Sequence, residues 1–136
     1  MIQDIGVAYQ DVIKQFYKAG CRNLQLDDCT WGAIVGDAAK QRYKALGIDL
    51  EDVKKQLLTV NNLALEGRPD DMVITSHICR GNYHSTFFTS GPYDTVADYV
   101  LQKKMLMHFS LNMMMKDLED LHHLRKYQKT RKLSLV

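Results

Sequence analysis

Residues 72–82 read Met72-Val73-Ile74-Thr75-Ser76-His77-Ile78-Cys79-Arg80-Gly81-Asn82, and this stretch decides the fold of the chain. A short apolar run that leads into polar residues and glycine is typical of a buried strand that ends in a loop. Because residues i and i+2 of a strand point to the same side, His77 and Cys79 are expected to face one point. Imidazole and thiolate are zinc ligands, so the pair is a candidate half of a zinc site, which needs three or four donors. The alternative is a buried structural thiol beside a polar loop.

A second strand is predicted earlier in the chain, where apolar and polar residues alternate over 22–28. Asp27 and Asp28 stand at its carboxyl end. They are candidates for binding a ligand, and the alternative is that they cap a helix or form a turn.

Helices are predicted around these two strands. Gly20 is expected to end the first helix, residues 37–46 form another, and a longer one runs from the cap Asp49 to about Leu65. Asp94 is expected to cap a last helix over 95–102. The apolar stripe of the first helix is Ile5, Tyr9, Val12, Ile13, Phe16 and Tyr17. Strands separated by helical crossovers indicate parallel βαβ units, in which ligands bind at the carboxyl ends of the strands.

The composition is that of one soluble domain. Of 136 residues, 46% are hydrophobic and 25% are charged, and no apolar run approaches the roughly 20 residues of a membrane span. We find no secretory signal pattern, and the three cysteines cannot all pair with one another. Reduced thiols in the cytoplasm are therefore expected, with no membrane partner.

Several further residues each allow two interpretations, a structural role or a functional one. Cys21 is expected to pack, whereas the sequence leaves Cys29 undecided. Trp31 either lines a pocket or packs in the core. Arg80 and His84 either bind an anionic ligand or occupy exposed loop positions, and exposed positions are the favoured interpretation.

Three stretches together resemble one known family. Residues 19–28 (AGCRNLQLDD), 66–72 (EGRPDDM) and 76–82 (SHICRGN) are similar to motifs of the cobalamin-independent methionine synthases, in particular to their short, single-barrel members. The resemblance runs from the first helix to about Lys104, and the motifs occur in the family's order.

The resemblance implies a fold and a reaction. The family fold is a (β/α)₈ TIM barrel, and its zinc-dependent members transfer a methyl group from a methyl-tetrahydrofolate-type donor to the thiol of homocysteine, a 5-methyltetrahydropteroyltriglutamate–homocysteine S-methyltransferase reaction in methionine biosynthesis. By motif position, His77 and Cys79 match the first two zinc ligands. Asp27 matches the carboxylate that holds the substrate amino group, and Asp28 matches its acidic neighbour. No residue is assigned as a catalytic acid or base, and the methyl donor is not determined by the sequence.

The chain departs from the family pattern after Lys104. The family's third zinc ligand, a glutamate in an FFLEYDD stretch, and its fourth, a cysteine, have no recognisable counterpart. Residues 105–115 instead contain five of the seven methionines. Read one base earlier, codons 113–116 give Tyr or His followed by Asp-Asp-Glu, which resembles the missing strand. We therefore predict that residues 105–136 are a frameshift product, and the alternative is a genuinely divergent methionine-rich helix.

The sequence thus predicts two parts. Residues 1–104 are expected to be a partial barrel of about two strands, with one substrate carboxylate and half of a zinc site. Residues 105–136 are expected to form a basic helical tail, with eight Lys or Arg against three Asp or Glu over 103–136. We expect this chain alone to be a poorly stable fragment that binds zinc weakly and is inactive.

Two other functions stay open. A small binding or regulatory protein would use the basic C-terminal helix for a partner or nucleic acid, through Arg125, Lys126, Lys129, Arg131 and Lys132. No recognised nucleic-acid motif accompanies that run, so a solvated tail is the favoured interpretation. The third possibility is another barrel enzyme of the same superfamily, such as a decarboxylase-like relative, against which the His77 and Cys79 pair argues.

Overall fold

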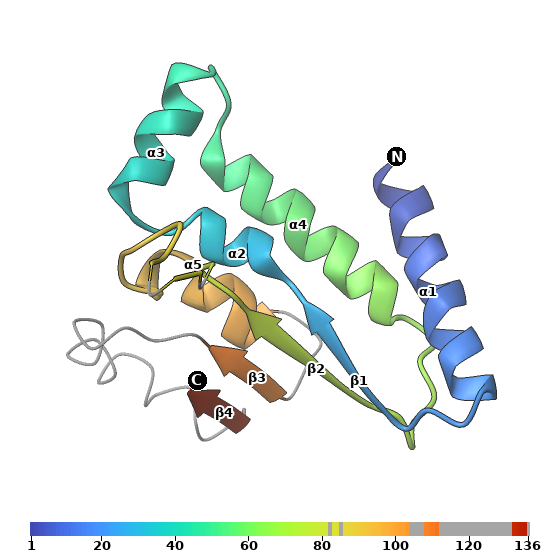
Figure 1. Ribbon diagram of the computed structural model, residues 1–136. Helices are drawn as coiled ribbons and strands as arrows, with labels where there is room; N and C mark the ends of the chain where they lie inside the picture. Colours follow the sequence, from blue (N-terminus) through green and yellow to red (C-terminus); the bar gives the residue numbers. More distant parts are fainter. Residues whose placement is uncertain (82, 85, 104–107, 112–131, 136) are drawn as a thin grey trace.

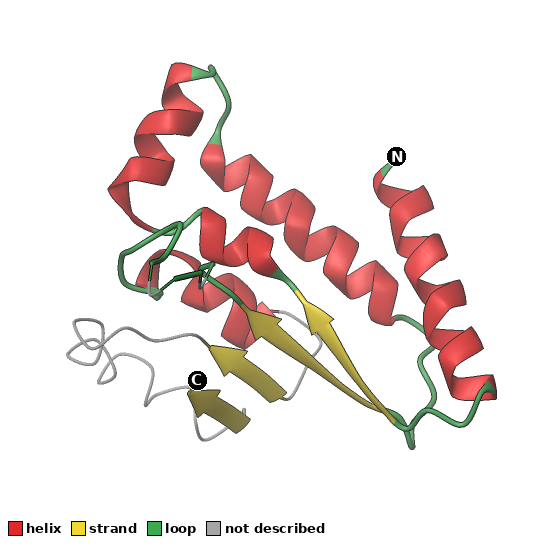
Figure 2. Cartoon of the chain, viewed as in Figure 1, coloured by secondary structure: helices red, strands yellow, loops and turns green. Residues whose placement is uncertain are grey.

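The computed structural model describes residues 1–81, 83–84, 86–103, 108–111 and 132–135, which form an α/β structure (Figures 1 and 2). Its helices are α1 (Ile2–Lys18), α2 (Cys29–Ala33), α3 (Gly36–Ala45), α4 (Leu50–Leu65), α5 (Asp94–Ala97) and the π-helix η1 (Asp98–Lys103). Its strands are β1 (Asn23–Asp27), β2 (Val73–Ile78), β3 (His108–Leu111) and β4 (Lys132–Leu135).

The strands form one parallel sheet in the order β1-β2-β3-β4, which is also their order along the chain. In the register of the first pair, Asn23 lies opposite Val73 and Asp27 lies opposite His77. The carboxyl ends of β1 and β2 therefore meet at one edge, as the predicted βαβ units require. No helix in the described part of the chain is long and apolar enough to span a membrane.

The predicted number of strands and the predicted helical tail are both corrected by this sheet. Besides the two expected strands, β3 pairs with β2 and β4 pairs with β3. Residues 108–111 and 132–135 are thus extended, because the backbone groups along an unpaired strand edge are satisfied when another strand joins it. The rest of the tail, with most of the basic residues proposed for partner binding, lies outside the described residues, and Lys132 begins β4.

The predicted helices α1, α3 and α4 form close to their expected bounds, whereas the short helix α2 was not predicted. α1 is followed by Gly20 at a φ of 97°, a left-handed conformation that glycine adopts without steric cost. The Asp49 side chain accepts a hydrogen bond from the Glu51 amide at 2.8 Å, so it caps α4 as expected. The last predicted helix differs, because Tyr93 rather than Asp94 occupies the N-cap and the helix continues as η1.

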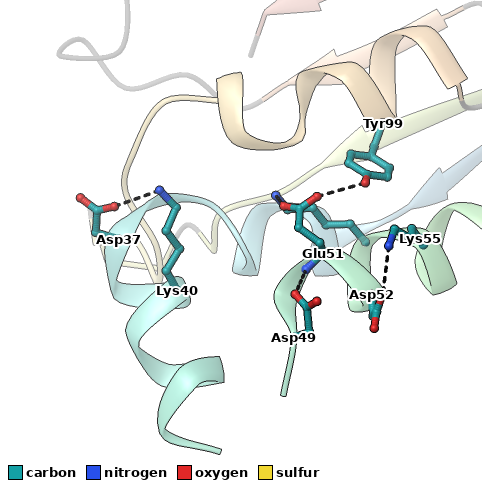
Figure 3. A network of polar contacts seen from close by, with 8 residues as sticks. Asp37, Lys40, Asp49, Glu51, Asp52, Lys55 and Tyr99 are labelled. Atoms are coloured by element: carbon teal, nitrogen blue, oxygen red, sulfur yellow. Dashed lines mark hydrogen bonds and ion pairs between the residues drawn. The ribbon is translucent and has the colours of Figure 1, made fainter. Parts of the chain in front are cut away.

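A polar network joins the start of α4 to η1 (Figure 3). The Lys54 ammonium lies 2.5 Å from one Glu51 carboxylate oxygen, and the Tyr99 hydroxyl donates to the other at 3.1 Å. Lys54 is buried and its Nζ lies 5.9 Å from the centre of the Tyr99 ring. These contacts hold the two crossover helices against each other on one side of the sheet.

The hydrophobic core lies between the helices and one face of the sheet, which we call the helix-covered face. Ile74, Ser76 and Ile78 of β2 are buried there. The core cluster includes residues of α1, α4, β2, α5 and η1, and the loop after α2; it comprises Ile13, Trp31, Ile34, Val35, Leu65, Met72, Ile74, Ile78, Tyr93, Val96, Ala97, Val100 and Leu101. Since one cluster joins both crossovers to the same strand residues, α4 and η1 cover the same face.

The opposite face of the sheet is more exposed, and we call it the open face. It carries Asn23, Gln25 and Asp27 from β1, all exposed, and Val73, Thr75 and His77 from β2, exposed or half-buried. Polar residues alternate with core residues along both strands, so the strand period of two separates the core from the open face.

α1 buries only part of the predicted stripe, since Ile13 lies in the core and Tyr17 packs against it. Gly6 and Ile13 are both buried, and a Cβ on Gly6 would lie 2.7 Å from the Cβ of Leu63 in α4. Four of the predicted apolar residues, Ile5, Tyr9, Val12 and Phe16, are instead 40–48% exposed. α1 packs on α4 at Gly6 because a residue without a side chain lets the two helix backbones approach closely (Figure 1).

Candidate functional site

The two polar clusters predicted from the sequence meet at the carboxyl edge of the sheet. Asp27 lies opposite His77 in the β1–β2 register, and both project from the open face. The next amide, that of Asp28, donates to the His77 carbonyl at 2.8 Å. This backbone bond extends the strand pairing by one residue, so the carboxylate of Asp27 and the imidazole of His77 are held on neighbouring backbones.

Asp28 occupies the N-cap position of α2, but its side chain makes no capping hydrogen bond. The capping interpretation of this aspartate is therefore wrong in its usual form, in which the carboxylate accepts from the first helical amides. Asp28 is half-buried, whereas Asp27 is exposed. Of the two carboxylates, Asp27 is the one presented on the open face.

Helix α2 sits directly on the end of β2. A Cβ placed on Gly32 would lie 2.1 Å from the carbonyl oxygen of Cys79, so only glycine permits this approach. The Thr89 hydroxyl donates to the Gly32 carbonyl at 2.6 Å and ties the following loop to the same helix. These contacts consequently join three segments into one wall of the pocket described below: α2, the residues after β2, and the loop that contains Thr89.

Cys29, which the sequence left undecided, belongs to this wall. Its thiol lies near the Asp27 carboxylate and the Cys79 thiol. Partial burial raises the pKa of the Cys29 thiol, and the hydrogen bond to Asp27 and the nearby Cys79 raise it further. A pocket of about 400 Å³ opens here, lined by Cys29, Thr30, Ala33, Cys79, Arg80, Gly81, Phe88 and Thr89.

His77 and Cys79 are the two predicted zinc donors. Both are half-buried, and the amide of Gly81 donates to the Cys79 sulfur at 3.2 Å. Among the described residues, no group of three or more His, Cys, Asp or Glu side chains is placed to hold a metal ion. The described donors therefore suit zinc in kind but fall short of the three that a catalytic zinc site needs.

Arg80 is buried, which corrects the favoured interpretation of an exposed loop position. Its guanidinium carbon lies 4.1 Å from the centre of the Tyr93 ring, and its carbonyl accepts from the Phe88 amide at 2.8 Å. The loop folds back over the arginine, and stacking on an aromatic ring compensates part of the cost of burying the charge. His84 is exposed, as expected, with its ring 4.2 Å from that of Tyr83.

Two other candidates serve the core. Trp31 is fully buried, donates from its indole nitrogen to Asn61 at 2.8 Å and stacks on Tyr99, so it packs rather than lining the pocket. Cys21 packs against the edge of the core, as predicted.

Comparison with known proteins gives similarities along most of this chain. No family model matches the sequence. Over 98 residues the chain is 47% identical to the uncharacterized protein YxjH of Bacillus subtilis, and over 97 residues it is 37% identical to YxjG of the same bacterium. These matches cover 72% and 71% of this chain, but the chain spans only about a quarter (26%) of the length of each relative.

A solved structure extends the similarity to the fold. It is the crystal structure of a Listeria monocytogenes protein provisionally named as a vitamin-B12 independent methionine synthase. The TM-score is 0.66 at 25% sequence identity, over 98% of this chain and 47% of the Listeria chain. The motifs noted in the sequence and the similarity in fold thus both lead to proteins of the methionine synthase type.

Proposed function

We propose that this chain carries the substrate-binding carboxylate and part of the zinc site of a cobalamin-independent methionine synthase. In the proposed reaction, the thiol of homocysteine accepts a methyl group from a methyl-tetrahydrofolate-type donor. The observation that carries the proposal is the register of Asp27 with His77 on the open face, at the strand edge where Cys79 follows.

The sheet order supports a barrel as the parent fold. Parallel strands in chain order, joined by right-handed crossovers, place every crossover helix on the same face. That arrangement is what a (β/α)₈ barrel requires, and α4 and η1 share one face here. On this proposal the open face is the barrel interior, and the carboxyl edge of the sheet is the catalytic end.

Asp27 is proposed to bind the ammonium group of the amino acid substrate. It is exposed on the open face, and its strand is tied to β2 through the Asp28 amide. A carboxylate fixed on a strand can hold an ammonium group in one orientation, which limits where the substrate sulfur can lie.

His77 and Cys79 are proposed as zinc donors, and Gly81 positions the sulfur through its amide. Zinc, when bound, keeps a substrate thiol as thiolate at neutral pH. Since the described residues supply two such donors from the predicted set, we expect the 136-residue chain alone to bind zinc weakly and not to turn over.

The test measures homocysteine binding to the folded chain by calorimetry, with and without zinc. We expect weak binding that is lost in Asp27→Asn and retained in Asp11→Asn, a matched change on the exposed side of α1. Zinc uptake should be weak and should disappear in His77→Ala but persist in Thr75→Ala, two residues earlier on the same face of β2.

Two results would overturn the proposal. One is homocysteine binding that Asp27→Asn leaves unchanged. The other is tight, stoichiometric zinc that His77→Ala does not affect, which would place the metal elsewhere in the chain.

A further inference from the structure

Two thiols from different elements lie together at the pocket described above. Cys29 begins α2 and Cys79 follows β2, fifty residues later in the chain. Both line the 400 Å³ pocket, and the Cys79 thiol is near enough to Cys29 to raise the pKa of its thiol. The third thiol, Cys21, lies apart, where it donates to the Asn23 carbonyl at 3.2 Å.

The fold holds this thiol pair through the backbone. Gly32 lets α2 touch the Cys79 carbonyl, and Cys29 precedes Gly32 by three residues, so the two lie on the same side of α2. At the other end, the bond from the Asp28 amide to the His77 carbonyl fixes where α2 starts. These backbone contacts therefore hold Cys29 and Cys79 at the same pocket.

The chemistry of the pair differs from that of a zinc site. Zinc takes three or four protein donors, whereas monovalent copper is satisfied by two thiolates and prefers soft sulfur ligands. Asp27, which contacts Cys29, is a hard oxygen donor that suits copper(I) poorly. Arg80 lines the same pocket, and its positive charge would offset part of the negative charge of a bis-thiolate complex.

We propose that Cys29 and Cys79 form a two-thiolate site for a thiophilic monovalent cation, of which copper(I) is the type. Binding one cation replaces the two thiol protons, which leave to solvent, and neither sulfur nor metal changes oxidation state. The site goes beyond the proposed function and needs neither His77 nor homocysteine. Because it uses Cys79, its occupation would compete with zinc for that sulfur.

The test is an anaerobic titration of the reduced chain with copper(I) against a chromogenic copper(I) chelator. We expect one copper(I) per chain. The affinity should fall by more than about 100-fold in Cys29→Ser and in Cys79→Ser, because each variant loses a sulfur that binds the metal directly. Loss of a residue that only supports a metal ligand costs about 10–100-fold. The matched control Cys21→Ser and the variant His77→Ala should both retain the wild-type affinity.

A second probe tests in the wild type whether the two thiols are adjacent, so its result does not depend on whether a cysteine variant folds. Phenylarsine oxide bridges two adjacent thiols, so mass spectrometry should find one adduct in the wild type and in Cys21→Ser, and none in Cys29→Ser. An adduct that survives Cys29→Ser, no copper(I) in the wild type, or copper(I) lost in His77→Ala would each overturn the two-thiolate site. The last result would assign copper to the His77 and Cys79 pair, whereas the proposed function would fail separately, through homocysteine and Asp27.

Discussion

The six residues of β2 alternate between the two faces of the sheet, and the two faces have different roles. Ile74, Ser76 and Ile78 are buried against the helices, whereas Thr75 and His77 are half-buried on the open face. The first set binds the sheet to α4 and η1, and the second set faces the candidate site. A single strand thus supplies both the stability of the fold and the chemistry of the site, and substitutions should separate the two.

The largest expected effect is on the helix-covered face. Ile78→Ala removes a fully buried side chain and should lower the free energy of unfolding by about 2–5 kcal/mol, through lost burial and the cavity left behind. Thr75→Ala, on the other face of the same strand, should cost about 1 kcal/mol or less. Urea unfolding of both variants measures the difference, and equal losses would contradict the assignment of the faces.

The next effect concerns the contact that joins the core to the site. Gly32→Ala puts a methyl group 2.1 Å from the Cys79 carbonyl, so α2 must move and stability should fall by about 1–3 kcal/mol. The same shift should separate Cys29 from Cys79 and reduce the phenylarsine oxide adduct. Thr30→Ala, an exposed change in the same helix, serves as the control. Wild-type stability in Gly32→Ala would show that α2 does not rest on β2.

A smaller effect is expected from pH at the α4–η1 contact. The hydrogen bond from Lys54 holds the pKa of the Glu51 carboxyl below its usual 4.5. Its contribution to stability is therefore complete above about pH 4.5 and is lost as the pH falls through the lower folded-state pKa. Because the Glu51 side chain is 55% exposed, the loss should stay below about 1 kcal/mol.

The variant Glu51→Gln isolates this contribution. Urea midpoints at pH 7 and pH 3 should differ less in the variant than in the wild type. An unchanged difference would mean that other carboxylates determine the acid sensitivity, and Asp52→Asn, in the neighbouring ion pair with Lys55, is the matched comparison.

The smallest expected change in stability is at the site itself. Asp27→Asn alters an exposed carboxylate on the open face and should shift the free energy of unfolding by no more than about 0.5 kcal/mol, while homocysteine binding is lost. Thermal unfolding monitored by circular dichroism checks the first part. A large destabilisation would assign Asp27 a structural role and weaken the separation between the two faces.

Local patterns predicted much of the fold. The alternation over 22–28, the cap at Asp49 and the glycine after α1 are signals carried within a few residues, and the corresponding elements formed. The strands β3 and β4 were missed, because the prediction of a helical tail took no account of the open edge of β2, with which residues 108–111 pair and to which residues 132–135 add a further strand. The frameshift hypothesis for residues 105–136 stays a prediction.

The candidate site was also predicted only in part, because some of its residues follow a local pattern and others come together only when the helices and strands pack. His77 and Cys79 are two residues apart, so strand geometry alone puts them on one side. Cys29 gave only a faint signal, its position two residues after Asp27 and three before a glycine. Its approach to Cys79 depends on how α2 packs, which no local pattern states.

The sequence by itself determined the order of helices and strands from α1 to β2, apart from the short α2, and the alternation that divides β1 and β2 between core and site, because these follow from residue spacing and backbone preferences. The tertiary structure decided which residues of α1 are buried, that Arg80 lies under a loop, and that Cys29 and Cys79 line one pocket. Those outcomes depend on how closely separate backbones approach, at Gly6 against α4 and at Gly32 against β2, and such distances arise only when the elements pack together.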